Sequence, residues 1–213
     1  MTADRAVLFD LDGTLADTAP DLAAALNFLR LQKNLNELPV GTVRPYASMG
    51  ARGLLLVGFG LKPEDAGFPA LRDAFLARYE TNVCVHTRLF PGMPELLAKL
   101  RVPWGIVTNK ATRFTAALVK ALKLSPACVV CGDSTPHLKP HPAPLLLAAE
   151  KLGIPCKDIL YVGDDLRDVQ AARAAGMCAV AVEYGYHGVD NGGPQSWNAD
   201  IVISHPEELL RHL

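Results

Sequence analysis

The sequence predicts an α/β fold in which a parallel sheet is covered by helices on both faces and carries an all-helical insertion. Three observations support this prediction. Short apolar segments of strand-like composition recur along the chain, helical patterns separate most of them, and residues 16–87 contain helical patterns with no convincing strand. A chain of 213 residues is long enough for one large domain with a smaller insertion.

The predicted strands are short apolar runs that each close in turn or polar residues. Such near-continuous apolar runs are typical of strands that are buried on both faces of a parallel sheet. In chain order they are "AVLFD" (6–10), "WGIVTN" (104–109), "CVVCGD" (128–133), "ILYVGDD" (159–165), "CAVAVEYG" (178–185) and "DIVIS" (200–204).

Helical patterns lie between most of these strands. Residues 111–124 repeat apolar side chains at helical spacing, and residues 141–153 and 167–176 each end in the glycine that commonly follows a helix C-terminus. Strands that alternate with helices in this way predict βαβ units, and therefore a Rossmann-like parallel core.

Residues 16–87 interrupt this alternation. Thr18 is the expected N-cap of a first helix, which continues through residues 22–32, and residues 71–83 form a second helix that closes the segment. The simplest domain organisation is therefore an α/β core made of residues 1–15 and 88–213, with a helical domain inserted between the two parts.

Polar side chains follow several of the predicted strands. Because ligands bind beyond the carboxyl ends of parallel strands, we expect these side chains to share one crevice. Several carboxylates at one place would repel one another unless a cation lay among them, and oxygen ligands of this kind suit Mg²⁺. The set comprises Asp10, Asp12, Thr108, Asn109, Lys139, Asp164 and Asp165.

The hydroxyl, the amide and the lysine of this set, beside a divalent cation, would bind a phosphate dianion. Asp10 can then act as a nucleophile, because metal and lysine neutralise the group being transferred to its carboxylate. A strand-end aspartate can instead cap the following helix. Asp10 and Asp12 together resist that simpler interpretation, since two carboxylates at one buried strand end are costly without a cation or partner.

The cysteines indicate a reducing environment. Their number, five, is odd, and their positions do not suggest a disulfide framework. Cys128 and Cys131 have the spacing of a zinc or redox pair, but they lie in a predicted strand, where cysteine packs as a small apolar residue.

Four motifs in this order resemble the haloacid dehalogenase superfamily: "DLDGT" (10–14), "VTNK" (107–110), "LKPHP" (138–142) and "GDDLRD" (163–168). The resemblance spans nearly the whole chain. It implies that magnesium is held by Asp10, by the main-chain carbonyl of Asp12 and by Asp164.

The resemblance also implies roles for the other motif residues. Asp10 is the nucleophile, and Asp12 serves as general acid and then as general base. Thr108 and Asn109 hold the phosphate and Lys139 clamps its charge. Asp168 orients Lys139 or a metal-bound water, and Asp165 is open to either role.

The insertion, residues 16–87, is similar in position and size to the cap domains of phosphoglycolate phosphatases and β-phosphoglucomutases. Within it, Arg52 is the candidate substrate contact, ahead of Arg44. The stretch "GDDLRDVQAARAAGM", "YGY" and the ending "WNADIVISHPEELL" resemble bacterial N-acetylmuramic acid 6-phosphate phosphatases. This resemblance slightly favours the amino-sugar phosphate over phosphoglycolate as substrate.

Two other functions stay open. A phosphosugar mutase like β-phosphoglucomutase would use the same residues, although "DGT" at 12–14 replaces the "DGV" common in those enzymes. A non-catalytic binding protein would be expected to have lost Asp10, Asp12 or Lys139, and all three are present.

Charge and hydropathy limit the partners. The chain carries 21 Lys and Arg against 22 Asp and Glu, so no broad charged surface is expected for nucleic acid or an anionic membrane. No apolar run approaches the length of a spanning helix. We expect a cytoplasmic monomer or homodimer that acts on a small-molecule phosphate ester. The loop at 184–194 has no predicted role.

Overall fold

The computed structural model describes residues 5–213, so residues 1–4 of the predicted core lie outside the described part of the chain. Each of the six predicted strands is present, and they form one parallel sheet in the order β5-β4-β1-β6-β7-β8. The strands are β1 (Ala6–Phe9), β4 (Trp104–Val107), β5 (Cys128–Val130), β6 (Ile159–Gly163), β7 (Cys178–Val182) and β8 (Ile201–Ile203).

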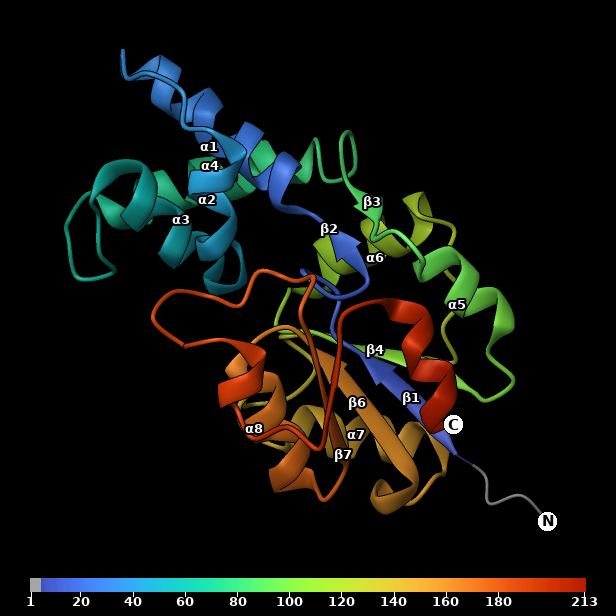
Figure 1. Cartoon of the computed structure of the whole chain (residues 1–213). Helices are drawn as coiled ribbons and strands as arrows, with labels where there is room; N and C mark the ends of the chain where they lie inside the picture. The colour runs from blue at the N-terminus through green and yellow to red at the C-terminus, as the bar shows by residue number, and fades with distance from the viewer. Residues whose placement is uncertain (1–4) are drawn as a thin grey trace.

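Helices cover both faces of this sheet (Figure 1), which confirms the predicted fold class. Strand β1 shows how the two faces divide, because Val7 and Phe9 point into one apolar cluster and Ala6 and Leu8 into the other. The first cluster includes residues of α5 (Met93–Lys99), α6 (Thr112–Ala121) and the C-terminal 3₁₀ helix η4 (Pro206–His212), and the second includes residues of α7 (Ala143–Leu152) and α8 (Leu166–Ala175).

Between β1 and α5 the described chain forms only helices and one short antiparallel ribbon. The helices are α1 (Ala19–Gln32), α2 (Val40–Val43), η1 (Arg44–Met49), α3 (Gly50–Phe59) and α4 (Phe68–Glu80). The ribbon pairs β2 (Ala16–Asp17) with β3 (Arg88–Leu89). We call residues 18–87 the helical insertion, and the ribbon joins both of its ends to the core. The sequence did not predict the ribbon, because two residues carry no readable alternation.

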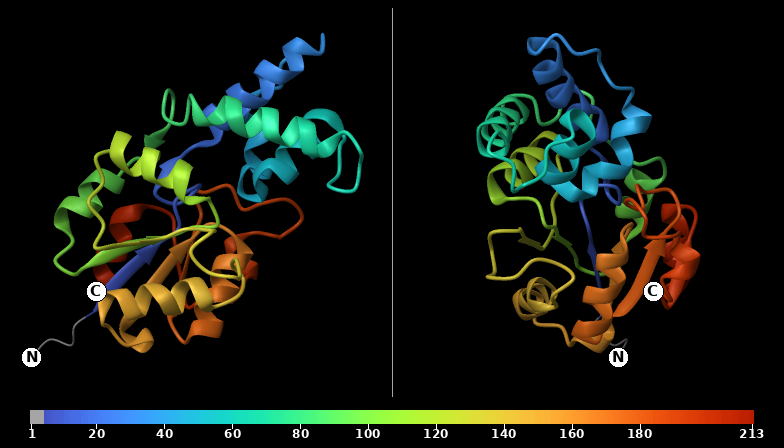
Figure 2. Two further views of the ribbon diagram at one scale, coloured as in Figure 1. Left: turned by 180° about the vertical axis from the view of Figure 1, so that it is seen from behind. Right: turned by 90° about the vertical axis from the view of Figure 1, so that its left-hand side faces the viewer.

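The helical insertion lies beyond the carboxyl ends of the strands, as the views of Figures 1 and 2 both show. Its helices pack on one another through α1, α3 and α4. Buried apolar residues of the insertion, such as Leu26, Leu54 and Phe75, belong to the same cluster as Val7 and Phe9 of the sheet. The insertion is thus packed directly over the end of the sheet where the polar residues gather.

Thr18 is the N-cap residue of α1, as predicted, but its side chain makes no capping hydrogen bond. Its hydroxyl donates to Asp12 Oδ1 instead. The hydroxyl of Tyr186 caps the start of the helix instead, because it accepts hydrogen bonds from the amides of Thr18 and Ala19 at 2.7 and 2.9 Å. This tertiary contact comes from the 184–194 loop, so local sequence could not reveal it.

No helix among residues 5–213 has the length and apolar character needed to cross a membrane.

Candidate functional site

A pocket of about 470 Å³ lies between the strand ends and the helical insertion. From the core it is lined by residues that the sequence singled out, and from the insertion by α1, η1, α3 and α4. The predicted site residues that line it are Asp10, Asp12, Arg52, Thr108, Asn109 and Lys139, with Asp165 and Asp168 beside them.

Asp10 follows β1 directly, at the floor of the pocket. Its main-chain amide donates to the carbonyl of Val162 at 2.9 Å, which keeps it in register with β6. One carboxylate oxygen accepts from the amide of Leu11 at 2.7 Å and lies 3.0 Å from Lys139 Nζ. The strand end therefore sets the position of this carboxylate.

Lys139 is almost fully buried and joins several groups of the core. Its ammonium lies 2.7 Å from Asp168 Oδ1 and donates to the hydroxyl of Tyr161 at 2.7 Å and to the carbonyl of Val107 at 3.1 Å. Burial opposes its charge, but Asp10 and Asp168 outweigh burial and raise the pKa of Lys139. It is therefore a fixed positive charge beside Asp10.

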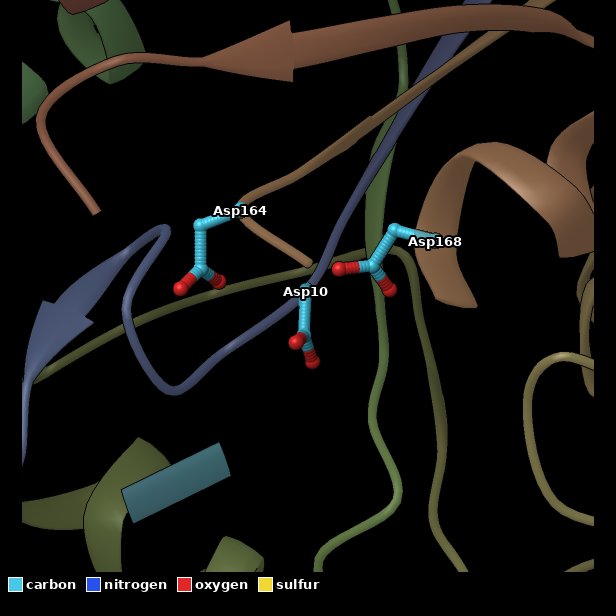
Figure 3. Close-up of side chains that lie close together, drawn as sticks. All are labelled: Asp10, Asp164 and Asp168. Carbon is cyan, nitrogen blue, oxygen red and sulfur yellow. The ribbon is translucent and has the colours of Figure 1, made fainter. Parts of the chain in front are cut away.

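Asp10, Asp164 and Asp168 form a cluster in which one oxygen from each lies within 4.8 Å of the others. Figure 3 shows Asp10 between the other two, with Asp164 coming from the end of β6 and Asp168 from the first turn of α8. Asp164 accepts from Thr14 Oγ1 at 2.9 Å and from the amide of Tyr186 at 2.8 Å. These bonds hold its carboxylate toward the cluster.

The electrostatics of this cluster fit a divalent cation. Burial raises the pKa of Asp10 to about 7; Lys139 opposes the rise, while Asp168 and Asp12 add to it. Burial, with repulsion from Asp10 and Asp168, raises the pKa of Asp164 well above its usual value. A divalent cation would relieve this repulsion, and carboxylate oxygens are the ligands that Mg²⁺ prefers. The residues present therefore fit that ion.

The side chain of Asp12 lies apart from this cluster. Its Oδ1 accepts from Lys110 Nζ at 2.8 Å and from the hydroxyl of Thr18. Lys110 belongs to the "VTNK" motif, but the sequence predicts no role for it. Its burial beside Asp12 results from tertiary packing. Burial opposes the charge of Lys110, but Asp12 and Tyr79 outweigh it and raise the pKa of Lys110.

Thr108 and Asn109 follow β4 and take different positions. Thr108 is buried, and its hydroxyl accepts from the amide of Lys110 at 3.2 Å. The amide side chain of Asn109 bridges the main chain of Lys139, donating to its carbonyl at 3.0 Å and accepting from its amide at 2.9 Å. Asn109 thus ties the loop that carries Lys139 to the end of β4.

Asp165, the second aspartate of "GDDLRD", pairs with Arg167, a contact that the sequence did not predict. Asp165 is the N-cap of α8, and its side chain forms a capping box with Asp168. Both of its oxygens also accept from the guanidinium of Arg167 at 2.9 Å. Arg167 in turn donates to the main-chain carbonyl of Ser48 at 2.9 Å, which links α8 to the helical insertion.

The two arginines singled out in the insertion differ. Arg52, in the first turn of α3, is exposed and lines the pocket. Arg44 is instead paired with Asp17, through two contacts of 2.8 Å, and its guanidinium lies 5.4 Å from the centre of the Tyr186 ring. The pair joins η1 to β2, so Arg44 is held in the connection between core and insertion.

The cysteines among residues 5–213 are all free thiols, and Cys128 and Cys131 are both buried. Burial raises the pKa of the Cys128 thiol, which favours its uncharged form. Neither residue belongs to the acidic cluster.

A doubly covered parallel sheet, with a buried carboxylate cluster and a lysine at its strand ends beneath a helical insertion, defines an α/β protein whose polar pocket lies where ligands bind in this class of fold. The model of the haloacid dehalogenase-like hydrolases matches residues 7–182, and the chain belongs to this family.

Known proteins are similar over nearly the whole chain. An N-acetylmuramic acid 6-phosphate phosphatase of Pseudomonas putida is 44% identical, over 97% of this chain and 95% of that protein. A phosphoglycolate phosphatase of Xanthomonas campestris is 41% identical, over 98% and 96%. The crystal structure of a predicted phosphoglycolate phosphatase from Haemophilus somnus has a TM-score of 0.87 at 29% identity, and the match covers 100% of this chain and 99% of that one.

Proposed function

We propose that this hydrolase is a phosphatase that removes the phosphate from a small phosphorylated metabolite through a phosphorylated Asp10. One observation carries the proposal: the Asp10 carboxylate lines the pocket, 3.0 Å from the ammonium of Lys139 and in one cluster with the carboxylates of Asp164 and Asp168. The names of the similar proteins support the same reaction.

The reaction has two steps. An oxygen of Asp10 attacks phosphorus, the bond from phosphorus to the ester oxygen breaks, and Asp12 gives that oxygen a proton. Water then attacks the phosphorylated Asp10 while Asp12 takes its proton, which releases phosphate and restores the carboxylate. Lys139 offsets the charge of the transferring group, with Thr108 and Asn109 near its oxygens.

Magnesium is the proposed cofactor. Asp10, Asp164 and the main-chain carbonyl of Asp12 would hold it, with Asp168 beside them. The ion supplies charge neutralisation for the phosphoryl group. Asp168 also contacts Lys139 and so keeps the lysine directed at Asp10.

Residues 16–87, which comprise the helical insertion and the first strand of the ribbon, are proposed to act as a cap domain over a core of residues 1–15 and 88–213. The helical insertion lies over the strand ends and contributes the wall opposite Asp10. A cap of this kind excludes water while Asp10 is phosphorylated and contacts the leaving group. Arg52 is the proposed contact from α3.

N-acetylmuramic acid 6-phosphate is the proposed substrate, ahead of phosphoglycolate. The pocket falls in the volume range of sites that enclose drug-sized ligands, and its lining combines apolar side chains such as Leu22 and Phe75 with a few polar groups. A two-carbon leaving group would leave much of this space unused, whereas an N-acetylated sugar ring would contact both kinds of surface.

Phosphate release tests the proposal. The wild type is assayed with magnesium and with chelator on N-acetylmuramic acid 6-phosphate, phosphoglycolate, common sugar phosphates and p-nitrophenyl phosphate, with Asp10→Asn as control. We expect release that needs magnesium and Asp10, with N-acetylmuramic acid 6-phosphate the best substrate. Isomerised sugar phosphate without release would indicate a phosphosugar mutase like β-phosphoglucomutase, and no reaction with any ester would contradict the phosphatase.

A further inference from the structure

Two residues of the helical insertion that line the pocket each have a buried hydroxyl group without a hydrogen-bond partner. The two groups are Ser48 Oγ in η1 and Tyr79 OH in α4. Among residues 5–213 the one other buried side-chain polar atom without a partner is Tyr184 OH, which lies outside the pocket lining. Buried polar groups in native proteins are normally paired, so two unpaired hydroxyls on residues of one pocket wall call for an explanation.

The position of Tyr79 suits hydrogen-bond donation into the pocket. Its ring is held between Phe75, at a centroid distance of 6.4 Å, and Phe114, at 5.4 Å, and the residue is fully buried. Burial raises the pKa of Tyr79 to about 12, with Lys110 opposing the rise. The hydroxyl therefore keeps its proton. The Lys110 ammonium donates to Asp12 at 2.8 Å and also acts on the Tyr79 oxygen as a charge and a hydrogen-bond donor, so the proton of the Tyr79 hydroxyl stays available for donation.

Ser48 is held in place from the core. Its main-chain carbonyl accepts from Arg167, and both oxygens of Asp165 fix that guanidinium. The salt bridge between Arg167 and Asp165 is largely shielded from solvent. Ser48 thus lines the pocket from a rigid attachment rather than from a free loop, which is the arrangement expected of a residue that selects a ligand.

We propose that Tyr79 OH and Ser48 Oγ determine leaving-group specificity by forming hydrogen bonds with hydroxyl or amide groups of a sugar. The inference rests on the proposed phosphatase reaction and goes beyond it by naming the residues that select a sugar as the leaving group. A buried hydroxyl left unpaired in the free enzyme is satisfied when a polar ligand enters, and it disfavours ligands that offer no partner. A pyranose carries such partners around its ring, and a two-carbon acid offers few.

The test measures kcat/KM for N-acetylmuramic acid 6-phosphate and for p-nitrophenyl phosphate in Tyr79→Phe, Ser48→Ala and the double variant. Each single substitution should lower kcat/KM for N-acetylmuramic acid 6-phosphate, relative to kcat/KM for p-nitrophenyl phosphate, by about tenfold. This is the effect of one lost hydrogen bond. Tyr184→Phe removes the unpaired hydroxyl outside the pocket and should leave the ratio at the wild-type value. Thermal unfolding of Tyr79→Phe measures any separate effect of the substitution on packing, which should be small because the ring and its stacking are retained.

Other outcomes overturn the inference. An unchanged ratio in both variants, or the same change in Tyr184→Phe, would show that the two hydroxyls do not recognise the leaving group. A wild-type preference for phosphoglycolate over every sugar phosphate would also overturn it, while leaving the phosphatase reaction in place. The absence of turnover on any ester, p-nitrophenyl phosphate included, would instead contradict the proposed function on which the inference rests.

Discussion

Lys110 Nζ lies 2.8 Å from Asp12 Oδ1, and the two side chains are only 9% and 12% exposed. This ion pair connects the end of β4 with the turn after β1. In the proposed mechanism Asp12 becomes a carboxylate when it protonates the leaving oxygen. The contact with Lys110 fixes the position of the Asp12 carboxyl group in the pocket, so Lys110 is expected to support proton transfer in the first chemical step.

Lys110→Met is expected to lower kcat by about tenfold on alkyl phosphates, because the contact that positions Asp12 for proton transfer is lost. The effect on p-nitrophenyl phosphate should be smaller, since nitrophenolate leaves with little protonation. Steady-state kinetics on the two esters measures the difference. Lys157→Met, at an exposed lysine, is the matched control. Equal losses on both esters would contradict this role.

Asp12→Asn should lower kcat on alkyl phosphates by about 10²-fold to 10⁴-fold, the usual contribution of a general acid or base. Asparagine has nearly the same shape and can still accept from Thr18, but it leaves the buried Lys110 ammonium without its ion-pair partner, so the melting temperature should fall. Kinetics with a series of leaving groups and a thermal unfolding curve check both expectations. Full activity on alkyl phosphates would remove Asp12 from the mechanism.

Magnesium should stabilise the fold as well as support activity, since it relieves the repulsion among Asp10, Asp164 and Asp168. At a free concentration of 100 times Kd, binding adds about 2.7 kcal/mol to the free energy of unfolding. Differential scanning calorimetry with and without chelator measures the rise. Asp164→Asn should reduce it, and Asp190→Asn, at an exposed loop position, should not. The same rise in Asp164→Asn would place the ion elsewhere.

Gly13→Ala should disrupt the site, because a Cβ at Gly13 would lie 2.1 Å from Asp164 Oδ2 and the residue has a φ of +82°. Gly153→Ala has a similar φ of +66° but meets no atom within 4 Å, so it controls for backbone strain alone. That strain costs about 1 kcal/mol. Urea unfolding and phosphate release should show a larger loss at Gly13, and equal losses would mean that the close approach is tolerated.

Arg52→Ala should raise the KM for N-acetylmuramic acid 6-phosphate more than the KM for p-nitrophenyl phosphate, because Arg52 lines the pocket on the insertion side. Arg72→Ala is the control, since Arg72 is exposed on α4 and pairs with its neighbour Asp73. Parallel changes in both KM values would argue against a contact with the leaving group.

Much of the fold was predictable because the information is local. Apolar runs such as residues 159–165 predicted the strands, and the glycines after α7 and α8 predicted where those helices end. The polar residues at the strand ends predicted a common crevice, because parallel strands end at the same edge of a sheet. The ribbon of β2 and β3 was missed, since each of its strands has only two residues.

The sequence by itself determined the α/β class and predicted that Asp10, Asp164 and Lys139 lie at the same edge of the sheet. It could do so because strand burial and strand direction follow from residue patterns. Tertiary structure decided the pairing of Lys110 with Asp12, the contact of Tyr186 with the start of α1, and the unpaired hydroxyls of Ser48 and Tyr79. The first of these joins the ends of two core strands, and the other two lie where the core and the helical insertion pack together. Contacts between segments far apart in the chain leave no periodic signal, so only the folded arrangement reveals them.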